Sequence, residues 1–412
     1  MVRLLKFFLL AICAVPLATG CNGCNDKASS ANTIIIVSSL PRTGSAQGQT
    51  DTIVNGIKMA LEEIDNKITL NGVEFKIEYQ DIDDATPTQG QWDAQRESSN
   101  ASNAVKNPDV MVYIGPYNSG AAKVSAPILN EGGLLQISPA VTYPGFTKPG
   151  TGEANEPGVY QKGGKKTFTR VVPADDLQGT KGAKWAKSLG VKTVYILDDK
   201  EVYGQGIANI FKATCKQIGI EVLGHDSIDP KQTDFRTKLS QIKNLNPDLL
   251  YVGATSQSGA GQIAKDMVAV GLNKCKMMGP DGCFEQAFIQ AAGADTFKTL
   301  DCYLTFPGIA PEKLTGKGKE FVDRYKQKYG KDPEAFAIYG YECGKVAIEA
   351  IKRSGKKDRE AIRAAAFTIK DFEEGALGKW SLDENGDTTI DVVNGVKVGP
   401  GKFEPFDKPI GD

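Results

Sequence analysis

The chain has little of what most enzymes and nucleic-acid-binding proteins depend on. Its single histidine, His225, excludes zinc motifs that need two histidines at short spacing, and the nucleophile motif G-x-S-x-G does not occur. Lysine and arginine (49) are balanced by aspartate and glutamate (50), and this formal net charge of −1 favours no nucleic-acid partner. No cluster of residues calls for a metal ion or a cofactor. The composition therefore favours a protein that is not an enzyme and has no catalytic residues.

Long apolar runs are also missing. The run at residues 7–15, which follows two basic residues, is too short to span a membrane and is typical of a secretory signal. Cys21 stands where a bacterial lipobox places its lipidated cysteine. We therefore expect residues 1–20 to be a signal peptide and residues 21–32 a tether, with a lipid anchor on Cys21. The alternative is ordinary signal-peptidase cleavage that leaves an unmodified thiol.

Cysteine is scarce in the body of the chain, and its number there is odd. The residues are Cys215, Cys275, Cys283, Cys302 and Cys343. Their spacing matches no common metal site, whereas an exported protein can form disulfides. Cys275 and Cys302 begin two runs that could be neighbouring strands, so this pair is the disulfide we expect.

The segment from residue 109 to residue 145 contains the clearest structural pattern. Two short apolar runs, residues 110–114 and 134–137, flank a segment with apolar residues at helical spacing. A strand, a helix and a strand of these lengths place both strands parallel, with their carboxyl ends at one edge of the sheet, where ligands bind. Ser119 stands just before the helix, so its hydroxyl and the free backbone N–H groups would face an anion. Thr142 would lie across from it.

A second series of strands and helices follows residue 173. Apolar runs at residues 191–197, 220–223, 249–252 and 276–278 are predicted to be strands, with helical patterns between them. Two such series in one chain of 412 residues predict an α/β protein with two lobes.

The last part of the chain is predicted to cross back between the lobes. Residues 300–306 form an apolar run, residues 317–367 contain three helical segments, and residues 379–397 are expected to be two strands around an acidic turn at 383–387.

The motifs of the chain resemble a known family. The pattern IGPYNSG…ISPAVT, followed by DDKEVYGQG, MGPDG and FAIYGYE, is similar to the leucine/isoleucine/valine-type periplasmic solute-binding proteins of ABC importers. The resemblance covers nearly all of the chain after residue 32. It implies a type I periplasmic binding protein fold, in which two doubly wound, Rossmann-like lobes with parallel central sheets are joined by three crossover strands.

The resemblance also implies a domain arrangement and a role. Residues 33–172 plus 307–375 would form the first lobe, and residues 173–306 plus 376–412 the second. The three crossings are expected near Val172, Phe306 and Gly375. The protein would be a periplasmic, membrane-anchored lipoprotein and a monomer, binding a small, branched-chain-like amino acid or a related solute and delivering it to an ABC permease.

A zwitterionic amino acid needs donors for its carboxylate and an acid for its ammonium group. Ser119, Thr142 and the backbone N–H at Ala140 would supply the donors. The resemblance assigns the acid to Asp281, where the family has the longer glutamate.

Four further residues stand at positions that contact or surround the ligand in the resembled family, and some of them differ from the family's residue. Tyr203 matches an aromatic residue that closes over the ligand, and Phe336 matches one that lines the side-chain pocket. Thr255 stands where the family has a second tyrosine that contacts the ammonium group. Arg42, in a first-lobe loop that lacks the family's aromatic residue, could bind a side-chain carboxylate or could be a solvated loop charge.

Two other functions stay open at this stage. The same fold could serve as a ligand sensor that docks on a receptor or regulator in place of a permease. A nucleotide-dependent enzyme is suggested by residues 259–264, which fit G-x-G-x-x-A with Asp281 twenty residues after Gly261. That motif begins seven residues after Val252, however, and not at the end of the strand.

Overall fold

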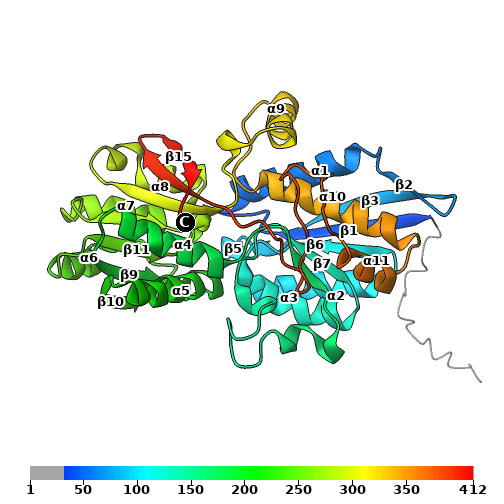
Figure 1. The fold of residues 1–412 in the computed structure, drawn as a ribbon, viewed down its shortest axis with the longest axis horizontal. Coiled ribbons are helices and arrows are strands. Elements are labelled where there is room, and N and C mark those ends of the chain that lie inside the picture. Colours follow the sequence, from blue (N-terminus) through cyan, green and yellow to red (C-terminus); the bar gives the residue numbers. More distant parts are fainter. Residues whose placement is uncertain (1–31, 412) are drawn as a thin grey trace, which may run out of the picture.

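The computed structural model describes residues 32–411, and within them the chain forms two lobes, each built around one β-sheet (Figure 1). The expected signal peptide and Cys21 lie outside the described residues. None of the helices in this range combines the length and the apolar character that crossing a bilayer requires.

The first lobe contains a sheet of six strands that is parallel except for its first strand. The strands, in spatial order, are β2 (Lys67–Leu70), β3 (Val73–Asp83), β1 (Thr33–Leu40), β6 (Val110–Ile114), β7 (Leu135–Ser138) and β8 (Phe168–Arg170). Alternate residues of β1 pack on opposite faces of the sheet, since Ile34 and Ile36 belong to one apolar cluster and Ile35 and Val37 to another. Burial on both faces explains why this strand is a continuous apolar run.

Helices cover both faces of this sheet (Figure 1). One face is covered by α1 (Gln47–Glu62), α10 (Ala337–Ser354) and α11 (Arg359–Ala366), and the other by α2 (Ala94–Lys106) and α3 (Ser119–Glu131). Helices α1 and α10 touch through glycines: a Cβ on Gly56 would lie 2.2 Å from the Ala337 carbonyl, and one on Gly340 would lie 2.2 Å from the Ile53 carbonyl. The close crossing fixes the start of α10, and with it Phe336, against the first lobe.

The second lobe contains a sheet of seven strands. In spatial order they are β10 (Glu221–Ser227), β9 (Thr193–Asp198), β11 (Leu249–Gly253), β12 (Lys276–Gly279), β13 (Cys302–Pro307), β14 (Val393–Gly399) and β15 (Lys402–Pro409). The first five are parallel, and β14 and β15 add an antiparallel edge. These two sheets bear out the expected α/β fold with two doubly wound lobes.

Helices also sandwich the second sheet. One face is covered by α4 (Asp175–Ser188) and α5 (Val202–Ile218), and the other by α6 (Arg236–Lys243), α7 (Ala260–Ala269) and α8 (Gln286–Ala292). Helix α9 (Lys317–Tyr329) follows the second crossing (Figure 1). A short ribbon of β4 (Ala85–Thr86) and β5 (Gln91–Trp92) extends from the first lobe.

The end of the chain differs from the expected strand pair at residues 379–397. The antiparallel hairpin is β14–β15, whereas residues 383–387 form a turn beside the isolated bridge between Leu382 and Thr388. Trp380 stays with the first lobe because its indole N–H donates to Glu342 at 2.6 Å. The third crossing therefore lies after the 383–387 turn and not near Gly375.

The expected disulfide between Cys275 and Cys302 is wrong. The five cysteines of the described range are all free and buried. Cys302, at the start of β13, pairs in register with Met277 of β12, whereas Cys275 comes two positions earlier and just before β12 begins. The strands are adjacent, as expected, but the register keeps the two cysteines from facing each other.

Candidate functional site

The candidate site lies between the lobes, at the carboxyl ends of strands from both sheets. Two adjoining pockets meet there. The Asp281 pocket has a cavity volume of about 20 Å3 and is lined by Tyr117, Asn118, Ser119, Ala140, Tyr203, Thr255, Asp281, Gly282 and Phe336. The second, the Glu201 pocket, also has a cavity volume of about 20 Å3 and shares Asn118, Ser119, Tyr203 and Thr255 with the first.

Ser119 begins helix α3 after a sharp turn out of β6. Gly115 makes this turn with φ of +119°, and a Cβ there would lie 2.4 Å from the Ser39 carbonyl. The Ser119 side chain is 2% exposed, and its hydroxyl has no hydrogen-bond partner in the described chain. A buried hydroxyl without a partner beside the free N–H groups of a helix start is suited to receive an anionic group.

The loop after β7 places Ala140 and Thr142 near this helix start. Ala140 lines the Asp281 pocket, but its N–H already donates to Ser138 Oγ at 3.2 Å, so it does not have the free backbone donor that was expected. Thr142 is fully buried, and its hydroxyl has no partner among the described residues. Its carbonyl accepts the N–H of Asp175 at 2.9 Å, which joins this first-lobe loop to the start of α4.

Asp281 and Tyr203 form the second-lobe wall. Tyr203, near the start of α5, donates a hydrogen bond of 2.5 Å from its hydroxyl to Asp281 Oδ1, and the Gly282 N–H donates to the same hydroxyl at 3.0 Å. Burial raises the pKa of Asp281 to about 6, although the bond from Tyr203 opposes that rise. The carboxyl group is therefore held in place but poorly solvated, as a partner for an ammonium group would be.

Asp175, at the first position of α4, is a component that sequence reasoning missed. It is fully buried, and both carboxyl oxygens are without a hydrogen-bond partner in residues 32–411. Burial, and then the nearby charge of Asp281, raise the pKa of Asp175 well above its ordinary value. Two buried carboxyl groups in one place favour a cationic group between or beside them. The only sequence signal was an acidic pair at a helix start, which is usually a cap.

Gln178, one turn after Asp175, also escaped the sequence analysis. Its amide nitrogen donates to the hydroxyl of Thr305 at 2.9 Å and to the carbonyl of that residue at 3.1 Å. Its oxygen, like those of Asp175, has no partner in the described part of the chain. Of the buried side-chain atoms without a partner in residues 32–411, those of Asn118, Ser119 and Gln257 belong to residues that line the two pockets, and those of Thr142, Asp175 and Gln178 belong to segments beside them.

An aromatic wall completes the Asp281 pocket. Phe336, the residue before α10, packs edge to face against Tyr117 at 5.9 Å between ring centroids, and against Phe306 at 5.6 Å. The Phe336 N–H donates to the buried Gln49 side chain at 3.3 Å. This wall offers apolar surface where the expected side-chain pocket lies.

Thr255 and Arg42 are placed differently from the other candidates. Thr255 lines both pockets, but its hydroxyl accepts the Ser258 N–H at 3.3 Å and lies 3.1 Å from the Ser258 hydroxyl, so it caps a short turn. Arg42 lines neither pocket. Its guanidinium is held by Asp51 at 2.7 Å and by Asp81 at 3.0 Å, which is the role of a structural ion pair.

The glycines of the possible dinucleotide motif face protein. A Cβ on Gly261 would lie 2.7 Å from the Phe288 carbonyl, and one on Gly259 would lie 3.1 Å from the Phe235 ring. A phosphate-binding glycine leaves its bare side open for the pyrophosphate. These two instead permit close packing around the start of α7, which argues against a nucleotide site there.

Comparison with known proteins agrees with this arrangement of lobes and cleft. The family model described as periplasmic binding protein matches residues 33–401. The Leu/Ile/Val-binding protein BraC3 of Rhizobium johnstonii is 29% identical over 88% of this chain and 91% of its own length. A leucine-, isoleucine-, valine-, threonine- and alanine-binding protein of Pseudomonas aeruginosa is 27% identical over 87% of each chain.

A solved structure shows the same likeness in three dimensions. The leucine-binding protein LivK of Thermotoga maritima superimposes with a TM-score of 0.79 at 26% identity, over 92% of this chain and 99% of its own. Sequence, fold and interlobe cleft lead to one conclusion: the chain belongs to the periplasmic binding protein family.

Proposed function

We propose that this protein is the extracytoplasmic solute-binding component of an ABC importer and that it binds a free amino acid between its lobes. Several relatives are named as binding branched-chain amino acids, and the family is extracytoplasmic. The protein would act as a monomer, without a cofactor, and hand its solute to a membrane permease. A lipid on Cys21 would keep it at the membrane surface.

The proposal rests on one observation: one side of the cleft offers a site for an anionic group, and the other side offers carboxyl groups for a cationic group. The first lobe supplies the unpaired Ser119 hydroxyl at a helix N-terminus, which suits a carboxylate. The second lobe supplies the buried carboxyl groups of Asp281 and Asp175, which suit an ammonium group. An amino acid carries both groups on one carbon atom, so it would contact both lobes at once.

The mechanism follows from this bridging position. A ligand that contacts both lobes stabilises the closed arrangement more than an open one, because only the closed arrangement completes its contacts. Closure also removes Asp281 from water, which strengthens its attraction to an ammonium group. A permease that recognises the closed form would then take up loaded protein and ignore empty protein.

Thermal unfolding of the purified protein tests the proposal. After bound solute has been stripped by unfolding and refolding, the protein is heated with amino acids, amides, small carboxylates and nucleotides in turn. A ligand at a hundred times its dissociation constant adds about 2.7 kcal/mol to the free energy of unfolding, which raises the melting temperature by a few degrees. The proposal is supported if an amino acid raises the melting temperature of the wild-type protein and does not raise that of the Asp281→Ala protein. The proposal would be overturned if only nucleotides raised the melting temperature, or if none of the amino acids did.

The membrane anchor has a separate test. Cell fractionation should place the wild-type protein with membranes and the Cys21→Ser protein in the soluble extracytoplasmic fraction. Cys24→Ser serves as the matched control, because it also removes a thiol near the processing site. Equal distribution of the wild-type and Cys21→Ser proteins would contradict lipidation.

A further inference from the structure

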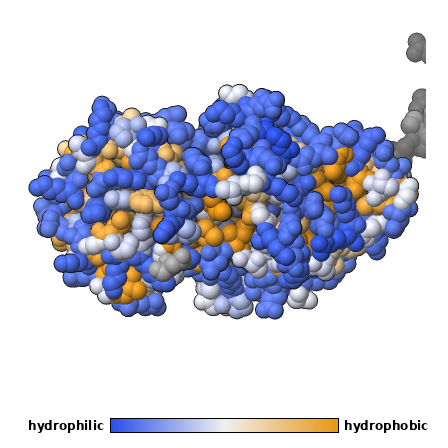
Figure 2. All heavy atoms as spheres, turned by 45° about the horizontal axis from the view of Figure 1, so that its top comes forward, coloured by the Kyte–Doolittle hydropathy of each residue, from blue (hydrophilic) through white to orange (hydrophobic). Residues whose placement is uncertain are grey.

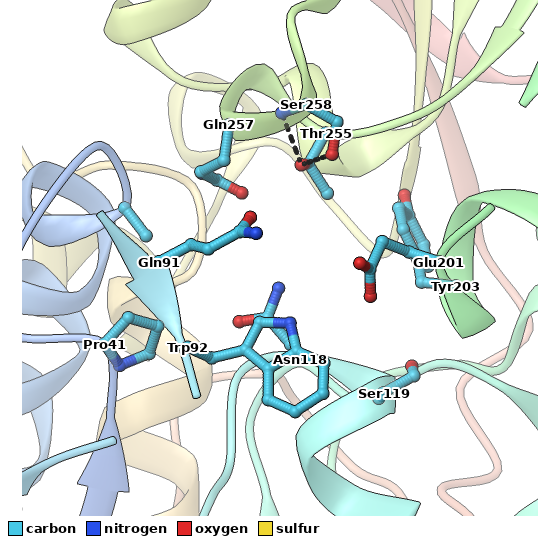
Figure 3. Close-up of a pocket in the computed structure, with 12 residues that line it drawn as sticks. Pro41, Gln91, Trp92, Asn118, Ser119, Glu201, Tyr203, Thr255, Gln257 and Ser258 are labelled. Carbon is cyan, nitrogen blue, oxygen red and sulfur yellow. Dashed lines mark hydrogen bonds between the residues drawn. The ribbon is translucent and has the colours of Figure 1, made fainter. Parts of the chain in front are cut away.

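The Glu201 pocket continues the cleft beyond the Asp281 pocket and differs from it in character. The two share Asn118, Ser119, Tyr203 and Thr255, so a ligand held at Asp281 has this second space beside it. The Asp281 pocket has an aromatic wall, whereas Figure 3 shows the polar ends of Gln91, Asn118, Glu201 and Gln257 directed toward the middle of the Glu201 pocket.

The pocket has N–H donors on Gln91, Asn118 and Trp92, but its charged group, Glu201, and two of its unpaired buried atoms are acceptors. The side-chain oxygens of Asn118 and Gln257 are buried and have no hydrogen-bond partner among residues 32–411. The Gln257 amide is oriented by its nitrogen, which donates to Glu285 at 2.8 Å, so its oxygen is left to face the pocket. The Glu201 carboxylate lies opposite these two oxygens (Figure 3). Buried acceptors without a donor cost free energy, and a ligand that brings donors removes this cost.

No lysine or arginine lines either pocket in the described part of the chain, and the charged side chains that do so are Glu201 and Asp281. The carboxyl groups of Glu201 and Asp281 therefore face the pockets with no cationic side chain of the described chain lining them, and N–H donors on a ligand would pair with them. We infer, on the basis of the proposed function, that the bound amino acid carries N–H donors at the end of its side chain, as a primary amide or a cationic group, and that the Glu201 pocket receives this end.

The pocket also contains apolar surface that suits the stem of such a side chain. Pro41, Ala46 and Trp92 line it next to the polar groups. Methylene groups can pack on these residues, and the flat face of an indole ring attracts cations. An aliphatic side chain would leave the acceptors unpaired, and an acidic one would be repelled by Glu201.

Calorimetric titration with pairs of amino acids of similar shape tests the inference. Asparagine is compared with leucine, glutamine with glutamate, and lysine with norleucine, each against protein stripped of bound solute. The donor-bearing member of at least one pair should bind at least about ten-fold more tightly than its partner, because a site built to bond N–H groups rejects a ligand without them. Tight binding of leucine and norleucine with none of asparagine, glutamine or lysine would overturn the inference and leave the proposed function standing. Binding of no amino acid at all would overturn the proposed function as well.

Three variants assign the effect to this pocket. Gln257→Leu should lower the affinity for the donor-bearing amino acid and reduce the ratio of that affinity to the affinity for the aliphatic amino acid. Gln217→Leu, on the exposed surface of α5, should change neither the affinity nor the ratio. Glu201→Gln separates the two donor classes: it should weaken binding of a cationic ligand by about ten-fold or more, and binding of an amide ligand by clearly less, because a Gln oxygen still accepts an N–H but carries no charge. An unchanged preference in the Gln257→Leu protein would contradict the role given to the Glu201 pocket.

Discussion

Tyr203 donates a hydrogen bond of 2.5 Å to Asp281, and this bond fixes the carboxylate that faces the first lobe. The two residues come from different βα units of the second lobe, since Tyr203 is in α5 and Asp281 follows β12. Gly282 permits the contact, because a Cβ there would lie 2.9 Å from both Tyr203 and Thr255. The carboxylate is therefore positioned before any ligand arrives.

Replacing Asp281 tests its role directly. Asp281→Ala should weaken amino-acid binding by roughly 1.5 to 3.5 decades, because a desolvated ammonium group without its partner costs about 2–5 kcal/mol. Tyr203→Phe keeps the ring and the Asp281 carboxylate but removes the hydroxyl that bonds Asp281 and the Gly282 N–H, so it should cause a smaller loss. Calorimetric titration measures both. An Asp281→Ala protein that binds its ligand with unchanged affinity would remove Asp281 from the ammonium site.

Binding should weaken in acid. With a pKa of about 6, Asp281 is mostly ionised at pH 7.5 and only about one-tenth ionised at pH 5, so the affinity for an ammonium-bearing ligand should fall about ten-fold or more between these values. Burial and the nearby Asp281 also raise the pKa of Asp175. Titrations at the two pH values measure the effect, and equal affinities would contradict it.

The same group affects the stability of the empty protein in the opposite sense. The pKa of Asp281 is higher in the folded protein than in the unfolded chain, so the folded state binds this proton more tightly. Its contribution to the free energy of unfolding is fully present below about pH 4 and is lost as the pH rises through about 6. Urea unfolding should show this loss in the wild-type protein and a weaker one in Asp281→Asn. If the free energy of unfolding depended on pH equally in the two proteins, Asp281 would not be the source of this loss.

Arg170 should be a major determinant of stability. It is fully buried, its Nε lies 2.7 Å from Asp387, and its other nitrogens donate to the carbonyls of Val141 and Tyr143 and to the Thr147 hydroxyl. Arg170→Met removes the nearest charged partner of the buried Asp387 carboxylate and leaves it with the Thr147 hydroxyl at 3.0 Å and Lys148 at 3.8 Å, which should lower the free energy of unfolding by about 3–5 kcal/mol in urea.

An exposed ion pair provides the control for Arg170. Arg236, whose side chain is 61% exposed, pairs with Asp234, and Arg236→Met should leave the free energy of unfolding nearly unchanged, because solvent screens an exposed ion pair. Similar losses for the two arginines would show that burial of the Arg170 pair does not matter.

The buried cysteines should be free thiols in the isolated protein. Alkylation in denaturant without reductant, followed by peptide mass analysis, should label Cys275 and Cys302 fully, and labelling of the folded protein should be slow because both are buried. Adding reductant should not change the melting temperature. Recovery of a Cys275–Cys302 cross-linked peptide would contradict the strand register.

The two-lobe fold could be predicted from the sequence because each strand and helix has a strong local pattern. Strand β6 begins and ends at the predicted residues, because buried parallel strands are short apolar runs bounded by turn residues, and α9 begins at residue 317, where the predicted helical segments begin. The final hairpin could not be placed in the same way. Residues 379–397 alternate like strands, but the buried contact between Trp380 and Glu342, 38 positions apart, keeps that segment in the first lobe.

The candidate site was predicted in outline, and what was missed depends on tertiary contacts. Ser119, Tyr203, Asp281 and Phe336 line one pocket, as motif positions led us to expect. Asp175 resembled an ordinary acid at a helix start, and only its burial near Asp281 distinguishes it. Arg42 looked available because its partners Asp51 and Asp81 lie 9 and 39 positions away.

The connections between the lobes determine how the cleft can open. Two of the three crossing segments are joined to each other, since the Gly308 N–H donates to the Val392 carbonyl at 2.7 Å and Pro307 pairs with Val393. The remaining crossing, between β8 and α4, is bonded to the start of the same C-terminal segment, since the Arg170 N–H donates to the Gly386 carbonyl at 3.0 Å and the Arg170 guanidinium pairs with Asp387. The three crossings therefore form one connected hinge region. We expect the lobes to rotate about this region as rigid bodies, which limits sideways displacement of Ser119 relative to Asp281.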